Sequence, residues 1–531
     1  MQALIFLLFS LVATTAHAEP GHFRYNLNIN PATLNPLTNH DNFSNEVMPW
    51  ISETLLQRDE NTYEWVPRLA STYEVSKDKK TYTFALREGV KFHDGSEFTA
   101  EDVEFSLLVY RTDLYGPGSQ RSELENIEKV EVLDKHRIRV TLKTPNFSSL
   151  QRMATVSIVP KATYGKKENV ARLNKTIIGT GPYRLKEYQD GVRLILEANP
   201  DWWGRSLPYF KDKYHFQRVT VRFGLDDEYK VLAVQKGDID YATISMTAYL
   251  TRTSGADWGK KYFAEKVNHQ GVVTTQNSFF LNLRSPLFKD KRVRQALQFL
   301  FNRQEMNQKF RGGLSELATG PWNRLNEYAD PAIKPTPFDP KKAAELLKQA
   351  GWRDSDQDGI LDKMIDGKKV DFRFSVLIAA RDWEKYMTIY QSDLQKAGIK
   401  LDILIQDWPL FVKNLDDLNF DAYIIGRGYP GVIDFDPLAE WHSSQAKKGG
   451  NNAIGFQNEK ADRLMERAQV EFDRKKRVKL LREVYRIAAE EQSQVFMFSD
   501  PYFFYVRSAR VKFDKPAQKY TLGIEDWKIA D

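Results

Sequence analysis

The sequence contains no cysteine among its 531 residues. This absence excludes disulfide bonds, thiolate nucleophiles, cysteine-ligated zinc, iron–sulfur clusters and a lipid-anchored N-terminal cysteine. A strong charge of either sign is also missing, because 77 Lys and Arg against 71 Asp and Glu leave a net charge of +6. So small an excess over so long a chain is unlike a dedicated nucleic-acid binder, and we expect no nucleic-acid partner.

Motifs of common hydrolase and nucleotide sites are missing as well. The chain has no H-E-x-x-H, G-x-S-x-G or G-x-x-x-x-G-K-[ST] pattern. Its eight histidines are scattered, with no close pair to chelate a metal. We therefore expect a protein that is not an enzyme and requires no cofactor. A secreted hydrolase is the alternative from another functional class, because residues distant in sequence can converge in a fold.

A long apolar run occurs only at the N-terminus. Residues 3–13 are apolar except for Ser10, and residues 16–18 (A-H-A) form an A-x-A cleavage pattern, although no Lys or Arg precedes the run. The run is too short to span a bilayer about 30 Å thick. Residues 1–18 are predicted to be a cleaved secretory signal peptide, with a buried N-terminal helix as the alternative. The mature chain would begin at Glu19 and reside in the periplasm.

The rest of the chain alternates strand-like and helix-like segments. Residues 82–86 and 138–142 alternate apolar and polar side chains, as half-buried strands do. Residues 292–301, 340–350 and 461–491 have helical periodicity or helix boundary signals, and the last is long enough for two helices. This alternation predicts an α/β fold, and the length predicts two or three domains.

A series of short motifs runs through nearly the whole mature chain. They lie at residues 34–36, 52–55, 67–70, 82–95, 98–106, 179–183, 199–204, 236–240 and 283–303. In this order they resemble the family 5 extracellular solute-binding proteins, the oligopeptide, dipeptide and nickel receptors of ABC importers. Their glycines, prolines and Asp-Gly turn favour a scaffold role. His93 and Asp94 are accordingly not predicted to be a catalytic pair.

The resemblance implies an α/β two-lobe periplasmic-binding-protein fold (type II, cluster C-like), joined by a two-strand hinge. Lobe I would comprise residues 19–277, including an extra subdomain at about 46–170. Lobe II would comprise residues 278–494, and residues 495–531 would return to lobe I. A hinge of two strands allows the lobes to close over a ligand.

In peptide-binding members of that family, an acid in a lobe II loop receives the ligand's amino terminus. When the motif is anchored on Asp436 and Pro437, the family's aspartate falls on Ile433, and Asp434 is one residue out of register. Either Asp434 forms a charge-assisted hydrogen bond with a ligand ammonium, or it is a solvated loop residue. The departure leaves open a peptide-like solute and a non-peptide one, such as a nickel chelate, a sugar or an opine.

Five further positions are candidate ligand contacts. Arg427 would receive a carboxylate through two hydrogen bonds, or else lie at the surface. Tyr429 and Trp408 would be aromatic walls, although Trp408 also fits a core position. The resemblance places His40 and Asn42 among cleft-lining residues. It also implies two partners, a peptide or peptide-like ligand and the transmembrane subunits of an ABC permease, with the protein a monomer.

One acidic loop follows the pattern D-x-D-x-D-G-x-x-D. Asp354, Asp356, Asp358 and Asp362 occupy positions 1, 3, 5 and 9 of an EF-hand-type loop, with glycine at position 6. Position 12 is Ile365, which offers no carboxylate. Two interpretations follow, a weak structural calcium site and an Asp/Gly turn joined to a β-hairpin.

Overall fold

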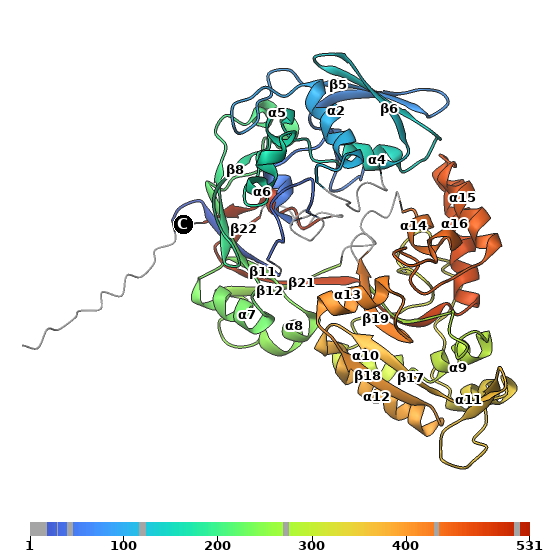
Figure 1. Ribbon diagram of the computed structural model, residues 1–531. Coiled ribbons are helices and arrows are strands. Elements are labelled where there is room, and N and C mark those ends of the chain that lie inside the picture. Colours follow the sequence, from blue (N-terminus) through green and yellow to red (C-terminus); the bar gives the residue numbers. More distant parts are fainter. Residues whose placement is uncertain are drawn as a thin grey trace, which may run out of the picture.

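Two separate β-sheets divide the molecule into two lobes (Figure 1). Lobe I is built on a seven-stranded sheet of order β12-β21-β11-β1-β10-β9-β8, and lobe II on a six-stranded sheet of order β14-β20-β13-β19-β17-β18. The α/β two-lobe architecture expected from the sequence is therefore present. The computed structural model describes residues 19–28, 30–39, 46–115, 124–268, 275–428, 435–513 and 521–530.

The lobe I sheet is mixed, with β1 parallel to β10 and β11 and the other neighbours antiparallel. Helices α7 (Asp227–Lys236) and α8 (Met246–Arg252) pack on β21, and an aromatic core that includes Phe23, Trp50 and Tyr183 packs on β1 and its neighbours. The seven strands are β1 (His22–Leu27), β8 (Tyr183–Gln189), β9 (Arg193–Ala198), β10 (Arg218–Phe223), β11 (Tyr241–Thr243), β12 (Tyr262–Asn268) and β21 (Tyr502–Ser508).

A smaller antiparallel sheet of order β4-β5-β7-β6 forms a subdomain of lobe I, drawn at the top of Figure 1. Burial alternates along β5 and β7, as the sequence predicts, and helix α2 covers the inner face. The elements are β2 (Leu56–Arg58), β3 (Trp65–Pro67), β4 (Ala70–Val75), β5 (Thr81–Leu86), α2 (Ala100–Leu108), β6 (Ile127–Asp134), β7 (Arg137–Leu142), α4 (Ser149–Ala154), α5 (Lys161–Tyr164) and α6 (Val170–Leu173).

In the lobe II sheet, β17 is parallel to β18 and β19, whereas β13 runs antiparallel to β19 and β20. The strands are β13 (Thr275–Leu281), β14 (Glu316–Leu317), β17 (Arg373–Ile378), β18 (Lys400–Ile405), β19 (Ala422–Gly428) and β20 (Gln494–Ser499). Its helices are α9 (Lys291–Phe299), α10 (Arg303–Arg311), α11 (Pro340–Gln349), α12 (Glu384–Lys396), α13 (Trp408–Asp416), α14 (Leu438–Trp441), α15 (Glu459–Gln469) and α16 (Arg474–Glu490).

Two short strand pairs complete the fold, β15 (Asp362–Ile365) with β16 (Lys368–Asp371), and β22 (Val511–Lys512) with β23 (Lys528–Ile529). Helices α9, α11, α15 and α16 confirm the helical segments predicted from periodicity. Within the described part of the chain, no helix combines the length and apolarity that a bilayer crossing requires.

The chain passes between the lobes at places other than those expected from the sequence. The expected boundaries, 277/278 and 494/495, both fall inside strands of the lobe II sheet, β13 and β20. In the described chain, β12 of lobe I ends at Asn268 and β13 of lobe II begins at Thr275, and β20 of lobe II ends at Ser499, with two residues between it and β21 of lobe I, which begins at Tyr502. Both expected boundaries lie in buried, apolar strands, which belong to the interior of the sheet and not to its connection with the other lobe.

Four of the sequence motifs meet at one buried carboxylate, Glu53. Its oxygens accept hydrogen bonds from Thr180 Oγ1 (2.8 Å), Trp202 Nε1 (3.2 Å) and Trp203 Nε1 (2.6 Å). The Arg68 guanidinium forms an ion pair with it at 2.8 Å. A buried charge is tolerated only when it is paired and hydrogen-bonded, so this cluster requires these residue types. The motifs therefore build the scaffold of lobe I.

A fifth motif joins the same region through His93. Its Nε2 lies 3.0 Å from the Gly181 carbonyl oxygen, and the Gly179 N–H lies 3.4 Å from its Nδ1. The neutral ring, with its proton on Nε2, satisfies both contacts, whereas a proton on Nδ1 would remove the acceptor for Gly179. Side chains at Gly179 and Gly181 would collide with the Ile51 carbonyl, so the backbones must stay in close contact.

We expect protonation of His93 to destabilise the protein in acid. Burial lowers the pKa of His93 to about 4 from 6.5. The unfolded chain then binds more protons between these pH values, so stability is complete above about pH 6.5 and falls as the pH drops towards 4, by on the order of 3 kcal/mol. Urea unfolding at several pH values should show this loss, and His93→Gln should flatten it. Equal slopes for both proteins over this range would contradict the assignment.

Candidate functional site

A cavity of about 440 Å³ lies between the lobes, next to the second passage of the chain. Lobe I lines it with residues 244–247. Lobe II lines it with Asn277, with the end of α10, and with Ala380, Asp382, Trp383, Lys385 and Tyr386. Residues 502–504 of β21 add to the lobe I wall, and Asp500 lines the cavity from the connection itself. Small-molecule sites in proteins typically enclose about 300–1,000 Å³, so the cavity has the size of a ligand site.

Strand order explains why the cavity is at this place. Residues 244–247 directly follow β11, which is parallel to β1, and residues 380–386 follow β17, which is parallel to β18 and β19. Each segment leads into a helix, α8 and α12 respectively. Ligands of α/β sheets bind in the crevice beyond the carboxyl ends of such strands. The carboxyl ends of these strands in both sheets therefore lie next to the cavity.

A fixed ion pair forms one wall of the cavity. Arg311, only 8% exposed, donates to Ser315 Oγ (2.6 Å) and to the Tyr386 hydroxyl (3.3 Å), and it pairs with Asp500. Asp500 also accepts from Ser315 Oγ (2.6 Å) and Asn277 Nδ2 (3.0 Å). Burial alone would lower the pKa of Arg311, but the Asp500 carboxylate raises it above its ordinary value. This wall is therefore charged but internally neutralised.

Two other charged side chains of the cavity have no such partner. Asp382 is exposed and Lys385 half-buried, and neither forms an ion pair with another of the described residues. The Lys385 ammonium instead lies 5.7 Å from the ring centroids of Phe310 and of Tyr386. Trp383 lies between the two charges in sequence and also lines the cavity. One free carboxylate, one free ammonium and several aromatic rings thus face the same space.

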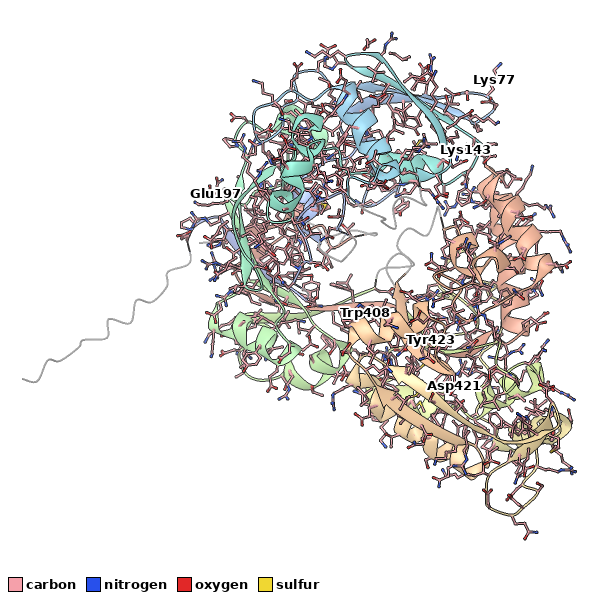
Figure 2. The ribbon with its side chains drawn as sticks, viewed as in Figure 1. Lys77, Lys143, Glu197, Trp408, Asp421 and Tyr423 are labelled. Carbon is pink, nitrogen blue, oxygen red and sulfur yellow. The ribbon has the colours of Figure 1, made fainter. Side chains whose placement is uncertain are left out.

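Of the ligand contacts expected from the sequence, Trp408 and Arg427 are described. Trp408 begins α13, is 56% exposed and stacks on Phe411, so the core interpretation is wrong; it lies on the side of lobe II turned towards lobe I (Figure 2). Arg427 is half-buried, with its Nη1 2.7 Å from Glu440 and its guanidinium 4.9 Å from the Phe280 ring centroid. Its charge is therefore already paired within lobe II.

Neither residue lines the cavity between the lobes. The other four expected ligand contacts lie outside the described residues, namely Asp434, Tyr429, His40 and Asn42. Their ligand contacts stay predictions.

Asp436, beside Pro437 in the lobe II loop, has a defined structural role. Its Oδ2 accepts from Arg152 Nη2 of the lobe I subdomain (3.2 Å) and from Gln469 Nε2 (3.1 Å), and its Oδ1 accepts from the Leu438 N–H (3.1 Å). Sequence reasoning missed Arg152, because nothing in the chain indicates that residues almost three hundred positions apart meet.

In the acidic loop, carboxylate oxygens of Asp354, Asp356 and Asp362 lie within 4.8 Å of one another, and Asp358 does not belong to the group. The Lys369 ammonium pairs with Asp356 and lies 3.8 Å from Asp362. The loop continues into the β15–β16 hairpin, as the second interpretation of the sequence expected. A lysine thus already supplies positive charge to the carboxylates, and the calcium interpretation stays a prediction.

Comparison with known proteins identifies the family. Residues 64–450 match the family model described as bacterial extracellular solute-binding proteins, family 5 (middle region). The chain belongs to this family. The oligopeptide-binding protein AppA of Bacillus subtilis is 31% identical over 490 residues, covering 88% of this chain and 84% of AppA. The structure of AppA with a nonapeptide matches with a TM-score of 0.80 and 28% identity, over 96% of this chain and 99% of that one.

Two further proteins are similar to this chain. The dipeptide-binding protein of Pseudomonas aeruginosa is 26% identical over 475 residues, 82% of this chain and 81% of that protein. NikZ of Campylobacter jejuni, solved with Ni(L-His), shares the fold, with a TM-score of 0.79 and 23% identity over 96% of this chain and all of NikZ. These matches confirm the resemblance that the motifs indicated and the two-lobe fold. The family consists of substrate-binding transport proteins.

Proposed function

We propose that this protein is the exported substrate-binding component of an ABC importer, capturing a peptide or peptide-like solute between its lobes and delivering it to a membrane permease. The observation that carries the proposal is the cavity lined by both lobes beside a chain passage. A ligand in such a cavity contacts both lobes only when they are together, so its binding favours the closed arrangement. The peptide ligands named for AppA support the choice of solute.

The free charges of the cavity match the two ends of a short peptide. The Asp382 carboxylate suits an ammonium, and the Lys385 ammonium suits a carboxylate, because charge-assisted hydrogen bonds are strong in sites that exclude water. Trp383, Phe310 and Tyr386 offer aromatic surface to apolar side chains. We keep Asp434 and Trp408 as further proposed contacts for such a ligand.

The remaining parts of the proposal concern location and partners. Residues 1–18 act as a signal peptide, supported by their apolar run and A-x-A pattern. The mature protein works in the periplasm as a monomer, not as a lipoprotein, since it has no cysteine to acylate. It requires no cofactor and leaves its ligand chemically unchanged.

Native mass spectrometry of the mature protein, purified without denaturation, tests the choice of solute. A peptide-sized adduct released intact supports the proposal. A nickel chelate, a sugar or an opine would identify the alternative cargo on the same fold, and a cleaved peptide would identify a hydrolase. Thermal shift with a di- to nonapeptide mixture checks binding independently, because a ligand that binds only the folded protein stabilises it.

We expect Lys385→Gln to weaken binding of a free short peptide about tenfold, equivalent to about 1.4 kcal/mol. The same substitution should have little effect on that peptide with an amidated C-terminus, since the amide has no charge to lose. Calorimetric titration of the parent protein and the variant with both peptides gives the coupling free energy between Lys385 and the peptide carboxylate. Lys396→Gln, at the far end of α12 and already paired with Asp393, is the control. Equal losses for both peptides would contradict a carboxylate contact, and Asp382→Asn with an N-acetylated peptide tests the other end.

A further inference from the structure

A second set of contacts joins the lobes, distinct from the two chain passages. Near α4, the lobe I subdomain meets α15, α16 and the segment that precedes α14 of lobe II (Figure 1). The contacts from lobe I come mainly from the short segment that contains Phe147 and Arg152, and Lys79 adds a cation–π contact with Phe472 at 5.9 Å. The two lobes thus touch at a rim that no backbone connection requires, and each contact there exists only while the lobes are together.

The polar part of this rim is centred on Asp436, whose side chain is 7% exposed. Arg152, 27% exposed, reaches it across the lobes at 3.2 Å, and Gln469 of α15 supports it from lobe II at 3.1 Å. Arg152 is itself oriented by a hydrogen bond from its Nε to Ser148 Oγ (3.1 Å). Both partners are held in place before they meet, which limits the entropy lost when the pair forms.

The second part of the rim involves Phe147. Its backbone N–H donates to the Gln469 carbonyl oxygen at 2.9 Å, and its ring centroid lies 4.1 Å from the Arg477 guanidinium carbon. Arg477 is only 4% exposed and also donates to the Glu471 carbonyl oxygen (2.9 Å). A guanidinium over an aromatic face is favourable, more so when shielded from water. Gln469 therefore takes part in both contacts and links them.

We propose that Arg152, Phe147, Asp436, Gln469 and Arg477 form an interlobe latch that holds the lobes closed and slows ligand release. The inference rests on the proposed function, in which the ligand enters and leaves by lobe separation. Any interaction present in the closed state and absent from the open one shifts the equilibrium towards closure by its own free energy. Opening breaks the latch, so the latch lowers the rate at which ligand escapes.

Arg152→Ala tests the latch. We expect the dissociation rate of bound peptide, measured by stopped-flow displacement, to rise about tenfold, with a smaller effect on the association rate. Because the rim pair is partly exposed, raising the salt concentration should speed release from the natural protein more than from the variant. Asp436→Asn, which keeps an acceptor for the Leu438 N–H, should act in the same direction. Arg137→Ala, which removes an exposed ion pair with Asp134 within the same subdomain, is the control and should change neither rate.

The absence of cysteine allows the lobe separation to be measured directly. Spin labels on Lys167→Cys in lobe I and Lys479→Cys on α16 report the interlobe distance by double electron–electron resonance, with and without peptide. Arg152→Ala should move the distribution towards longer distances. Identical distributions and release rates for variant and parent would overturn the latch. Failure of the proposed function is separate, since it would appear as no peptide binding to the unaltered protein.

Discussion

Glu53→Ala is expected to lower the free energy of unfolding by about 3–5 kcal/mol, the range found when one partner of a buried ion pair is removed. The substitution would leave the Arg68 guanidinium, 4% exposed, without its carboxylate. It would also remove the acceptor for Thr180 Oγ1 and for both indole N–H groups of Trp202 and Trp203. Each buried donor without a partner adds its own desolvation penalty.

Urea unfolding followed by far-UV circular dichroism measures this effect. Glu53→Gln, which keeps the shape and one acceptor oxygen, should fall between the parent and Glu53→Ala. Combining Glu53→Ala with Arg68→Met should recover part of the loss, because the double variant leaves no unpaired charge. Glu131→Ala, which removes an exposed pair with Lys129, should change stability by less than about 1 kcal/mol. A Glu53→Ala protein as stable as this control would contradict the role assigned to the cluster.

The scaffold of lobe I could be predicted because its chemistry restricts residue type. A buried carboxylate needs a cation and several donors, so Glu53, Arg68, Thr180 and Trp202 appear in the sequence as motifs. The same holds for the glycines that contact the backbone at Ile51. Each such constraint fixes the residue type at one position. The resulting motif can therefore be recognised in the sequence before the structure is known.

The cavity could not be predicted in the same way. Asp382 lies in the short 3-10 helix Arg381–Trp383 and Lys385 in the first turn of α12, whereas residues 244–247, which line the cavity with them, are more than 130 positions earlier in the chain. A side chain exposed in the cavity wall satisfies no packing requirement. Its position therefore accepts many residue types, and no motif marks it in the sequence. The one available signal was positional, since the segment after a parallel strand is where α/β proteins bind ligands.

The passages between lobes show a related limit. Strand β20 is buried at all six positions, and the lobe boundary that the resemblance implied, 494/495, falls inside it. Its apolarity marks an interior strand of the lobe II sheet, between β13 and β14. Of the two connecting residues, Asp500 is polar and pairs with Arg311 of lobe II. Pro501 has no backbone N–H and cannot donate a hydrogen bond to a neighbouring strand. A hinge lies where regular pairing stops, which hydropathy alone does not reveal.

Thr247→Trp is expected to weaken peptide binding at least a hundredfold, equivalent to about 2.7 kcal/mol or more. Thr247 lies at the start of α8 and lines the cavity from lobe I, opposite α12 of lobe II. An indole there occupies cavity space that the ligand needs. Overpacking of this kind acts on the closed, ligand-bound state, whereas in the open state the ring extends into solvent.

The lobes themselves should fold normally in this variant, because Thr247 is only half-buried and its helix is unchanged. Thr251→Trp supplies the matched control, since Thr251 is exposed on the same helix, one turn further on and outside the cavity wall. Calorimetric affinities and melting temperatures of both variants separate obstruction from misfolding. Two variants with equal melting temperatures and a large affinity loss at position 247 alone would place the ligand in this cavity. Undiminished affinity of Thr247→Trp would place it elsewhere between the lobes, because a filled cavity cannot also hold a peptide.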